Sequence, residues 1–384
     1  MGLLLTALLL ASLQSPGAAP AAAKAPTLSE AIDQLGSIEY DVRTRASRTV
    51  RRAAPAEAVP ALTAAVERHD DGYVRYRALV LLSAFNHRIT PDVMRQAMLD
   101  PNDRLRTVAY AWFERHPDPE VVSTLLDRLE HETSEFVRPA LIRAMAAAAA
   151  DPRVQTVLLR EVNRGEDFFR SAVIDALGRH KAAYAIDALA AVAKLEGPLQ
   201  DDAALALGRI GGRRGLPVLA ALQRTAPREV QPAIAAGICL LGQNCAAHRN
   251  FLVRTLTFAE ETIGFQELLR GAASGLGAIA ETGDRDAMVA LIETGIPSTD
   301  PARAPIALAL ASAAVANPAF LLDTLENRAD LADALTLLME GFDMLEEDFA
   351  EEQFFAAVRR AYWAAPEGSP RRRLVEAIVT RLDF

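Results

Sequence analysis

The chain has 384 residues, with 50 Asp and Glu against 41 Lys and Arg, and its net charge is −9. This charge disfavours proteins that hold nucleic acid through bulk positive charge, so no nucleic-acid partner is expected. Half of the residues are apolar, mainly Ala and Leu, and only 6% are aromatic. Because Ala, Leu, Arg and Glu are strong helix formers, the composition favours a folded, all-helical protein and disfavours an enzyme built on a sheet.

The first 23 residues are typical of a secretory signal peptide. Residues 2–13 form an uncharged apolar run that is shorter than a transmembrane helix, so no stable membrane span is expected. Ala21, Ala22 and Ala23 suit cleavage before Lys24, although no Lys or Arg precedes the apolar run. We therefore expect a signal peptide over 1–23, a short linker over 24–28 and a periplasmic or secreted protein. The alternative is an uncleaved N-terminal segment that tethers the chain.

A repeat organises the chain after the linker. An aliphatic residue or Phe is followed by Arg or Gln, and the second residues of successive pairs are separated by 32, 31, 32, 32, 30, 31 and 39 residues. The pairs are Val42-Arg43, Val74-Arg75, Leu105-Arg106, Val137-Arg138, Phe169-Arg170, Leu199-Gln200, Val230-Gln231 and Leu269-Arg270. A period in this range predicts a solenoid, in which each unit buries its apolar face only by stacking on its neighbours.

Each repeat is predicted to contain two helices. Counted from the aliphatic residue, apolar or small residues return at +4 and +8, as in Val137, Leu141 and Met145, which places them on one stripe of a second helix. Apolar segments before it, such as residues 121–126 and 186–189, predict the first helix.

The sequence also predicts helix ends. Asp118-Pro119 and Asp151-Pro152 suit the start of first helices, because proline is tolerated there. Acidic residues upstream of second helices can cap them, and glycines are expected where these helices stop. The acidic residues are Asp71, Asp103, Glu135 and Asp167, and the glycines are Gly178, Gly208 and Gly242.

Together these elements predict an all-α, right-handed α-solenoid of about ten to eleven stacked two-helix repeats. Residues 29–318 are expected to form the repeat solenoid. The pattern weakens over 319–384, which are expected to form degenerate repeats and a C-terminal cap.

The units resemble HEAT repeats. The second helix begins with an acidic-x-x-Val-Arg-x-x-Ala pattern and ends with Ala-Leu-Gly, as at residues 176–178. The short period is similar to that of the HEAT repeats in phycobilisome lyase subunits. The resemblance covers about residues 29–280; it implies the fold and says little about function.

The sequence lacks the common motifs of catalytic and metal sites, including His-Glu-x-x-His, Cys-x-x-Cys, Gly-x-Ser-x-Gly, the Walker loop and the EF-hand loop. Residues 275–280 match the Gly-x-Gly-x-x-Ala fingerprint of dinucleotide sites, but they lie in a predicted second helix and not after a strand. We therefore predict no catalytic, cofactor-binding or metal-binding residues and no enzymatic activity.

The repeated arginines form a ladder along the second helices. They are Arg43, Arg75, Arg106, Arg138 and Arg170. One interpretation is a cationic groove on the concave wall. The favoured interpretation is structural: each Arg pairs with an acidic residue of an adjacent unit and satisfies the loops between repeats.

The opposite face of the second helices, in units two to four, carries aromatic, aliphatic and Arg side chains. They are Tyr76, Leu79, Val80, Tyr110, Ile142 and Arg143. This composition is typical of protein-binding patches, so we predict a partner-binding face here. The alternative is that neighbouring helices cover these residues.

Residues 340–352 form an acidic segment interleaved with Phe342, Leu345 and Phe349. A solvated helix face is the favoured interpretation, and a site for a cation or a basic partner is the alternative.

Cys239 and Cys245 are the only cysteines, and they flank Gly242 in the one unit that is lengthened. In an exported protein they could form a disulfide; two free buried thiols are the alternative.

These observations favour an exported, non-enzymatic scaffold that presents a concave surface to a protein or peptide in the cell envelope. The alternative is a lyase-type accessory subunit that acts on a chromoprotein or another protein, as the short repeats imply. A HEAT-repeat DNA glycosylase is disfavoured, because it would need a basic groove.

Overall fold

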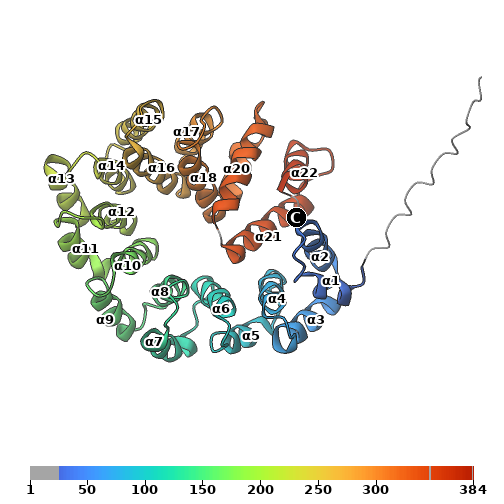
Figure 1. Cartoon of the computed structure of the whole chain (residues 1–384). Coiled ribbons are helices and arrows are strands. Elements are labelled where there is room, and N and C mark those ends of the chain that lie inside the picture. Colours follow the sequence, from blue (N-terminus) through green and yellow to red (C-terminus); the bar gives the residue numbers. More distant parts are fainter. Residues whose placement is uncertain (1–25, 346, 383) are drawn as a thin grey trace, which may run out of the picture.

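The computed structural model describes residues 26–345, 347–382 and 384, and within them it contains 22 α-helices, two short 3-10 helices and no strand. The predicted signal peptide (1–23) and the start of the linker (24–28) lie outside the described residues. The helices alternate between an outer and an inner layer of a curved stack (Figure 1). The fold is thus the predicted all-α solenoid of stacked helix pairs, and the described helices form eleven such pairs.

The odd-numbered helices from α1 to α19 form the outer layer. Two 3-10 helices, Pro119–Val121 and Ala183–Ala185, directly precede α7 and α11. The outer helices are α1 (Leu28–Gln34), α3 (Pro55–Arg68), α5 (Thr90–Ala97), α7 (Val122–His131), α9 (Pro152–Glu161), α11 (Ile186–Ala193), α13 (Gly215–Thr225), α15 (Cys245–Glu261), α17 (Arg285–Gly295) and α19 (Pro318–Leu325).

The even-numbered helices form the inner layer, and a last pair follows them. The inner helices are α2 (Tyr40–Arg52), α4 (Gly72–Ala84), α6 (Asp103–Arg115), α8 (Arg138–Ala147), α10 (Asp167–Arg179), α12 (Gln200–Ile210), α14 (Gln231–Leu240), α16 (Gln266–Glu281), α18 (Arg303–Ala316) and α20 (Leu331–Leu345). The last pair is α21 (Asp348–Ala364) and α22 (Pro370–Leu382).

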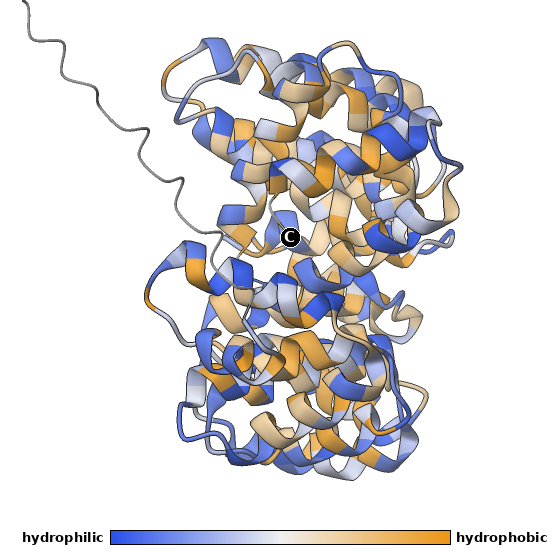
Figure 2. Cartoon of the chain, turned by 90° about the vertical axis from the view of Figure 1, so that its right-hand side faces the viewer, coloured by the Kyte–Doolittle hydropathy of each residue, from blue (hydrophilic) through white to orange (hydrophobic). Residues whose placement is uncertain are grey.

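The core is an apolar seam between the two layers and consists of two clusters that adjoin at α14, one over residues 31–238 with Phe349 and one over residues 235–384. The predicted stripe is buried throughout, with Val137, Leu141 and Met145 each at most 1% exposed. In Figure 2 the helices carry both hydrophobic and hydrophilic stretches, as expected where each helix packs on one side only. The side chains of Asp71 and Asp151 accept hydrogen bonds from backbone N–H groups and cap α4 and α9.

The glycines play a different part from the one predicted. Gly178 and Gly208 lie inside α10 and α12 and do not follow their ends. A Cβ atom on Gly178 would lie 2.9 Å from Cα of Ala206, and one on Gly208 would lie 2.3 Å from Cα of Gly237. Inner helices approach one another so closely here that only glycine fits. Gly242 does follow α14, with a positive φ of 74°.

The solenoid curves into a ring that closes on itself. Figure 1 shows the red helix α21 reaching the blue helices at the start of the chain. Helix α21 packs against α4 and α6 as well as against α18, α19 and α22. Residues 319–384, predicted to be degenerate repeats and a cap, therefore also complete the ring.

Within the described part of the chain, no single helix is both long and apolar enough to cross a bilayer. Helices α18 and α19 reach that length and composition only as a pair, and the chain bends by 116° between them.

Candidate functional site: the concave wall and the helix that occupies it

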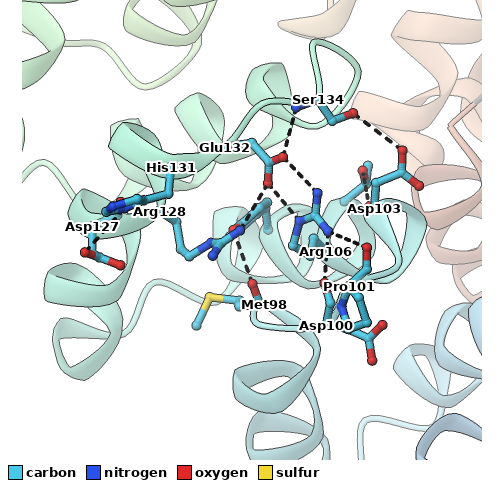
Figure 3. Close-up of polar contacts among 12 residues, drawn as sticks. Met98, Asp100, Pro101, Asp103, Arg106, Asp127, Arg128, His131, Glu132 and Ser134 are labelled. Carbon is cyan, nitrogen blue, oxygen red and sulfur yellow. Dashed lines mark hydrogen bonds and ion pairs between the residues drawn. The ribbon is translucent and has the colours of Figure 1, made fainter.

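The arginine ladder holds the ends of the outer helices. The side chain of Arg106 donates to both carboxylate oxygens of Glu132, each at 2.8 Å, and to the carbonyl oxygens of residues 100 and 101 (Figure 3). Glu132 is the residue that follows α7 of the next unit. Arg75 likewise pairs with Asp100 of the next unit and donates to the carbonyl of Val66, which lies in α3.

The other three ladder residues make only part of this pattern. Arg43 donates to the carbonyls of residues 37 and 38, and Arg170 donates to the carbonyl of Val162 and pairs with Asp167 of its own helix. Arg138 lies 3.9 Å from the ring centre of Phe169 in the next inner helix. The shared role is thus to hold backbone carbonyls or a neighbouring unit, and pairing with an acidic residue of another unit occurs at Arg75 and Arg106.

Four residues of the predicted partner-binding face are inaccessible. Leu79, Val80, Tyr110 and Ile142 are each at most 1% exposed, so the prediction that they form an exposed patch is wrong. Helices α4, α6 and α8 are each flanked by two other inner helices, and the buried residues stand at +5, except Val80, which stands at +6. The hydroxyl of Tyr110, for example, donates to the carbonyl of Met98 at 3.4 Å.

The other two residues, Tyr76 and Arg143, do lie on the concave wall, where they meet the start of α21. Tyr76 Oη donates to the carboxylate of Asp348, and Arg77 Nη1 donates to the same oxygen at 2.5 Å. Arg51 of α2 forms a two-pronged pair with Glu352, at 2.9 Å from Nε and 2.6 Å from Nη2 to the same oxygen, Oε2. Glu352 is 1% exposed, so this pair is buried.

Three further contacts extend this junction. Arg143 Nη2 lies 3.4 Å from Oε1 of Glu347, and Gln353 Nε2 donates to Ser83 Oγ at 3.1 Å. Phe349 packs into the apolar core of the N-terminal half. We call the contacts of residues 347–353 with Arg51, Tyr76, Arg77, Ser83 and Arg143 the clasp, and we call these five residues the clasp site.

The electrostatics of the clasp favour its charged form. Burial opposes ionisation of Asp348, but Arg77 and Tyr76 outweigh it and hold the pKa of Asp348 below its usual value. Burial and the neighbouring Asp348 raise the pKa of Tyr76, which therefore stays protonated and able to donate. The pKa of Arg77 is raised because the attraction of Asp348 outweighs the effect of burial.

The acidic segment 340–352 is only in part the solvated helix face that its pattern favoured: Asp343 and Glu347 are exposed, whereas Glu352 is buried. It contains the end of α20 and the start of α21, and Glu346 lies outside the described residues. The basic partner of Asp348 and Glu352 is the N-terminal half of the same chain. Burial, with Asp348 next to it, raises the pKa of Glu351 to about 7.

A network of ion pairs between nearby inner helices was not predicted. Arg209 of α12 pairs with Asp175 of α10 at 2.6 Å and with Glu281 of α16 at 3.2 Å. Glu114 of α6 pairs with Arg143 of α8 at 3.2 Å. Burial opposes ionisation of Glu114, but His180 and Arg143 hold its pKa below the usual value.

The sequence did contain a signal for this network. Counted from the aliphatic residue of each repeat, Arg143 and Asp175 stand at +6, and Arg209 stands at +10. The offsets alone do not fix exposure, since Val80, also at +6, is 1% exposed.

The concave wall continues beyond the clasp over α12, α14, α16 and α18. Two shallow clefts of about 190 and 230 Å³ hollow it, and both small and charged side chains line them. Asp201, Asp202 and Arg270 line the first cleft, and Ser274 lines both. Burial raises the pKa of Asp202 to about 6.

Cys239 and Cys245 form a disulfide whose Cα atoms are 4.0 Å apart, and it joins the end of α14 to the start of α15. Among the residues that the structure describes, no three His, Cys, Asp or Glu side chains gather in a way that could hold a metal ion.

Comparison with known proteins finds similarity in fold. No protein-family model matches the chain, and no curated protein matches it in sequence. Among solved structures, the phycocyanin lyase complex of CpcE and CpcF from Nostoc sp. PCC7120 is 19% identical, with a TM-score of 0.28, and the match covers 86% of this chain and all of that one.

Importin beta is 12% identical over 92% of this chain, with a TM-score of 0.40, and Kap121p bound to Pho4p is 13% identical over 92%, with a TM-score of 0.34. This chain spans 58% of importin beta and 45% of Kap121p. These similarities concern the stacked helical fold alone.

Proposed function

We propose that the chain is an exported, non-enzymatic scaffold of the cell envelope, which binds a protein or peptide on its concave wall. The observation that carries the proposal is the clasp: a charged part of this wall already holds a helix, α21. The neighbouring part of the wall, over α12 to α18, is hollowed by two clefts that small and charged side chains line. The apolar run at residues 2–13 supports export.

The binding proposal is tested by placing a photo-crosslinking amino acid at Ser274, which is exposed on the concave wall. The control position is Asp187 on the outer helix α11, whose side chain is 85% exposed. In native cells we expect a protein adduct from position 274 and none from position 187. Equal adducts at both positions, or none at 274, would contradict a concave binding site.

The export proposal is tested by the intact mass of the native protein from fractionated cells. We expect a periplasmic species that begins at Lys24 and gains two hydrogens on reduction, because Cys239 and Cys245 are bonded. A full-length cytosolic species would contradict export.

That second outcome would favour the alternative function, a lyase-type accessory subunit that acts on a chromoprotein or another protein. The repeat period of 30 to 32 residues over most of the array supports this alternative, because it resembles the short HEAT repeats of lyase subunits.

A further inference from the structure

The two halves of α21 are attached to different parts of the ring. Phe354 and Val358 are buried in the apolar core of the C-terminal half. Among the described residues of α21, Phe349 alone belongs to the core of the N-terminal half. The other contacts with that half include ion pairs and hydrogen bonds, such as those of Asp348 and Glu352, and the guanidinium of Arg51 also lies 5.5 Å from the ring centre of Phe355. The clasp can therefore open while α21 stays packed on α18, α19 and α22.

The clasp site has a defined chemistry. Arg51, Arg77 and Arg143 supply three positive charges on α2, α4 and α8, although Arg143 also pairs with Glu114 of α6, and Tyr76 supplies a hydroxyl donor. The occupant matches them with carboxylates at 347, 348 and 352 and inserts one aromatic ring, Phe349, between them. The site is therefore complementary to an acidic helix in which Asp-Phe is followed, three residues after the Phe, by Glu.

We propose that the clasp site is a binding site for an acidic, Phe-containing helix of another protein, and that α21 occupies it until that partner displaces it. This inference rests on the proposed function and names the chemistry of the partner. Charge complementarity carries it: three arginines face an occupant that contributes three carboxylates.

A partner helix is favoured over a second copy of this chain. Two copies that exchange α21 would form the same contacts that each had already made, and they would lose translational freedom on association. A helix from another protein can add contacts, because the wall continues into the clefts over α12 to α18.

The test uses a fluorescent peptide with the sequence of residues 347–357 and three forms of the full chain. The first is wild type. The second carries Asp348→Ala, Phe349→Ala and Glu352→Ala, which remove the carboxylates paired with Arg77 and Arg51 and the buried ring, and leave the residues of the clasp site intact. The third adds Arg77→Glu to the second. Circular dichroism confirms that each variant remains helical. Light scattering detects any dimer that forms when two copies exchange α21.

Because α21 competes at a high local concentration, we expect the freed variant to bind the peptide at least about tenfold more tightly than wild type does. Addition of Arg77→Glu should remove that gain, and higher salt should weaken binding. Equal binding to wild type and to the freed variant would overturn the proposal. So would binding that Arg77→Glu leaves unchanged, or a stable dimer of the freed variant in place of peptide binding.

A second measurement covers the case in which the freed variant does not fold. Ser83→Cys and Gln353→Cys place two thiols where the side chains are hydrogen-bonded, and a short bismaleimide then locks the ring. Cys239 and Cys245 are already bonded to each other and do not react. We expect locking to reduce peptide binding at least about tenfold. Unchanged binding would overturn the proposal.

The outcome can be separated from that of the proposed function. If position 274 gives adducts but the peptide binds neither the freed variant nor the unlocked chain, only the proposal of an acidic-helix partner is overturned. The absence of adducts from position 274 would count against the concave scaffold itself.

Discussion

The substitution Gly208→Ala tests whether the backbones of two inner helices are in close contact at this position. Alanine in a helix interior is ordinarily favoured over glycine by about 1 kcal/mol. Here the new Cβ would lie 2.3 Å from Cα, 2.7 Å from the carbonyl oxygen and 2.9 Å from the carbonyl carbon of Gly237. These are backbone atoms, so no side chain can turn away, and overpacking of this kind costs up to about 3 kcal/mol. The net expectation is destabilisation by about 2 kcal/mol.

Gly271→Ala is the matched control, because it makes the same change in another inner helix. Its Cβ would lie 3.3 Å from Cβ of Pro232, a contact that a small shift relieves. Urea unfolding should show the control at or above wild-type stability and Gly208→Ala clearly below it. If Gly208→Ala stabilises the protein as much as the control does, the reasoning about inner-helix contact is refuted.

Three further predictions concern the clasp and the disulfide. Glu352→Gln should destabilise the protein by about 3 kcal/mol in urea unfolding, because it leaves the charge of Arg51 buried, and a loss below about 1 kcal/mol would contradict a buried pair. Folding raises the pKa of Glu351 from 4.5 to about 7, so the folded state binds the proton more tightly and loses stability as pH rises through this range. Thermal melts at pH 5 and pH 8 measure how much free energy of unfolding is lost between these values, and Glu351→Gln should lose about 1 to 2 kcal/mol less than wild type. Equal losses in the two proteins would contradict the raised pKa of Glu351. Replacing Cys239 and Cys245 by Ser should cost roughly 2 kcal/mol, because the bond closes a short loop, and an unchanged melting temperature would show that the bond adds nothing.

Local periodicity was enough to predict the repeats. The residues at 0, +4 and +8, such as Val137, Leu141 and Met145, face the outer helix of their own unit, and that partner lies within about one repeat in sequence. The period also placed the Arg ladder at one position of every inner helix, where Arg75 and Arg106 reach the next unit.

The same periodicity misplaced Tyr110. It separates the stripe that faces the outer helix from all other positions, and it does not distinguish positions that face neighbouring inner helices from those that face the centre of the ring. Tyr110, at +5, is covered by its neighbours, whereas Arg143, at +6, reaches the concave wall. One position along the helix rotates the side chain by about 100°, and in a solenoid that rotation separates a core residue from a surface residue.

The closed ring was beyond sequence reasoning for a different reason. Tyr76 and Asp348 are separated by 272 residues, and they meet only because small changes in direction accumulate over ten units. The sequence shows that residues 340–352 are acidic and that Arg51 and Arg77 are basic, but no local pattern indicates that they pair with each other. A slightly larger side chain at Gly208 or Gly237 would change the direction of the array and separate them.

The chemistry of the clasp explains why this junction differs from every other junction in the ring. Adjacent repeats are joined by apolar stripes, and separating them would expose large hydrophobic surfaces to water. The clasp joins its two sides mainly through Arg51, Arg77 and Arg143, whose charges are readily hydrated when the contact opens. Opening it exposes the ring of Phe349, which alone among the described residues of α21 belongs to the N-terminal core. The junction between the first repeats and α21 is therefore the place where the ring can open without loss of the solenoid, and the place where a competing acidic helix can enter.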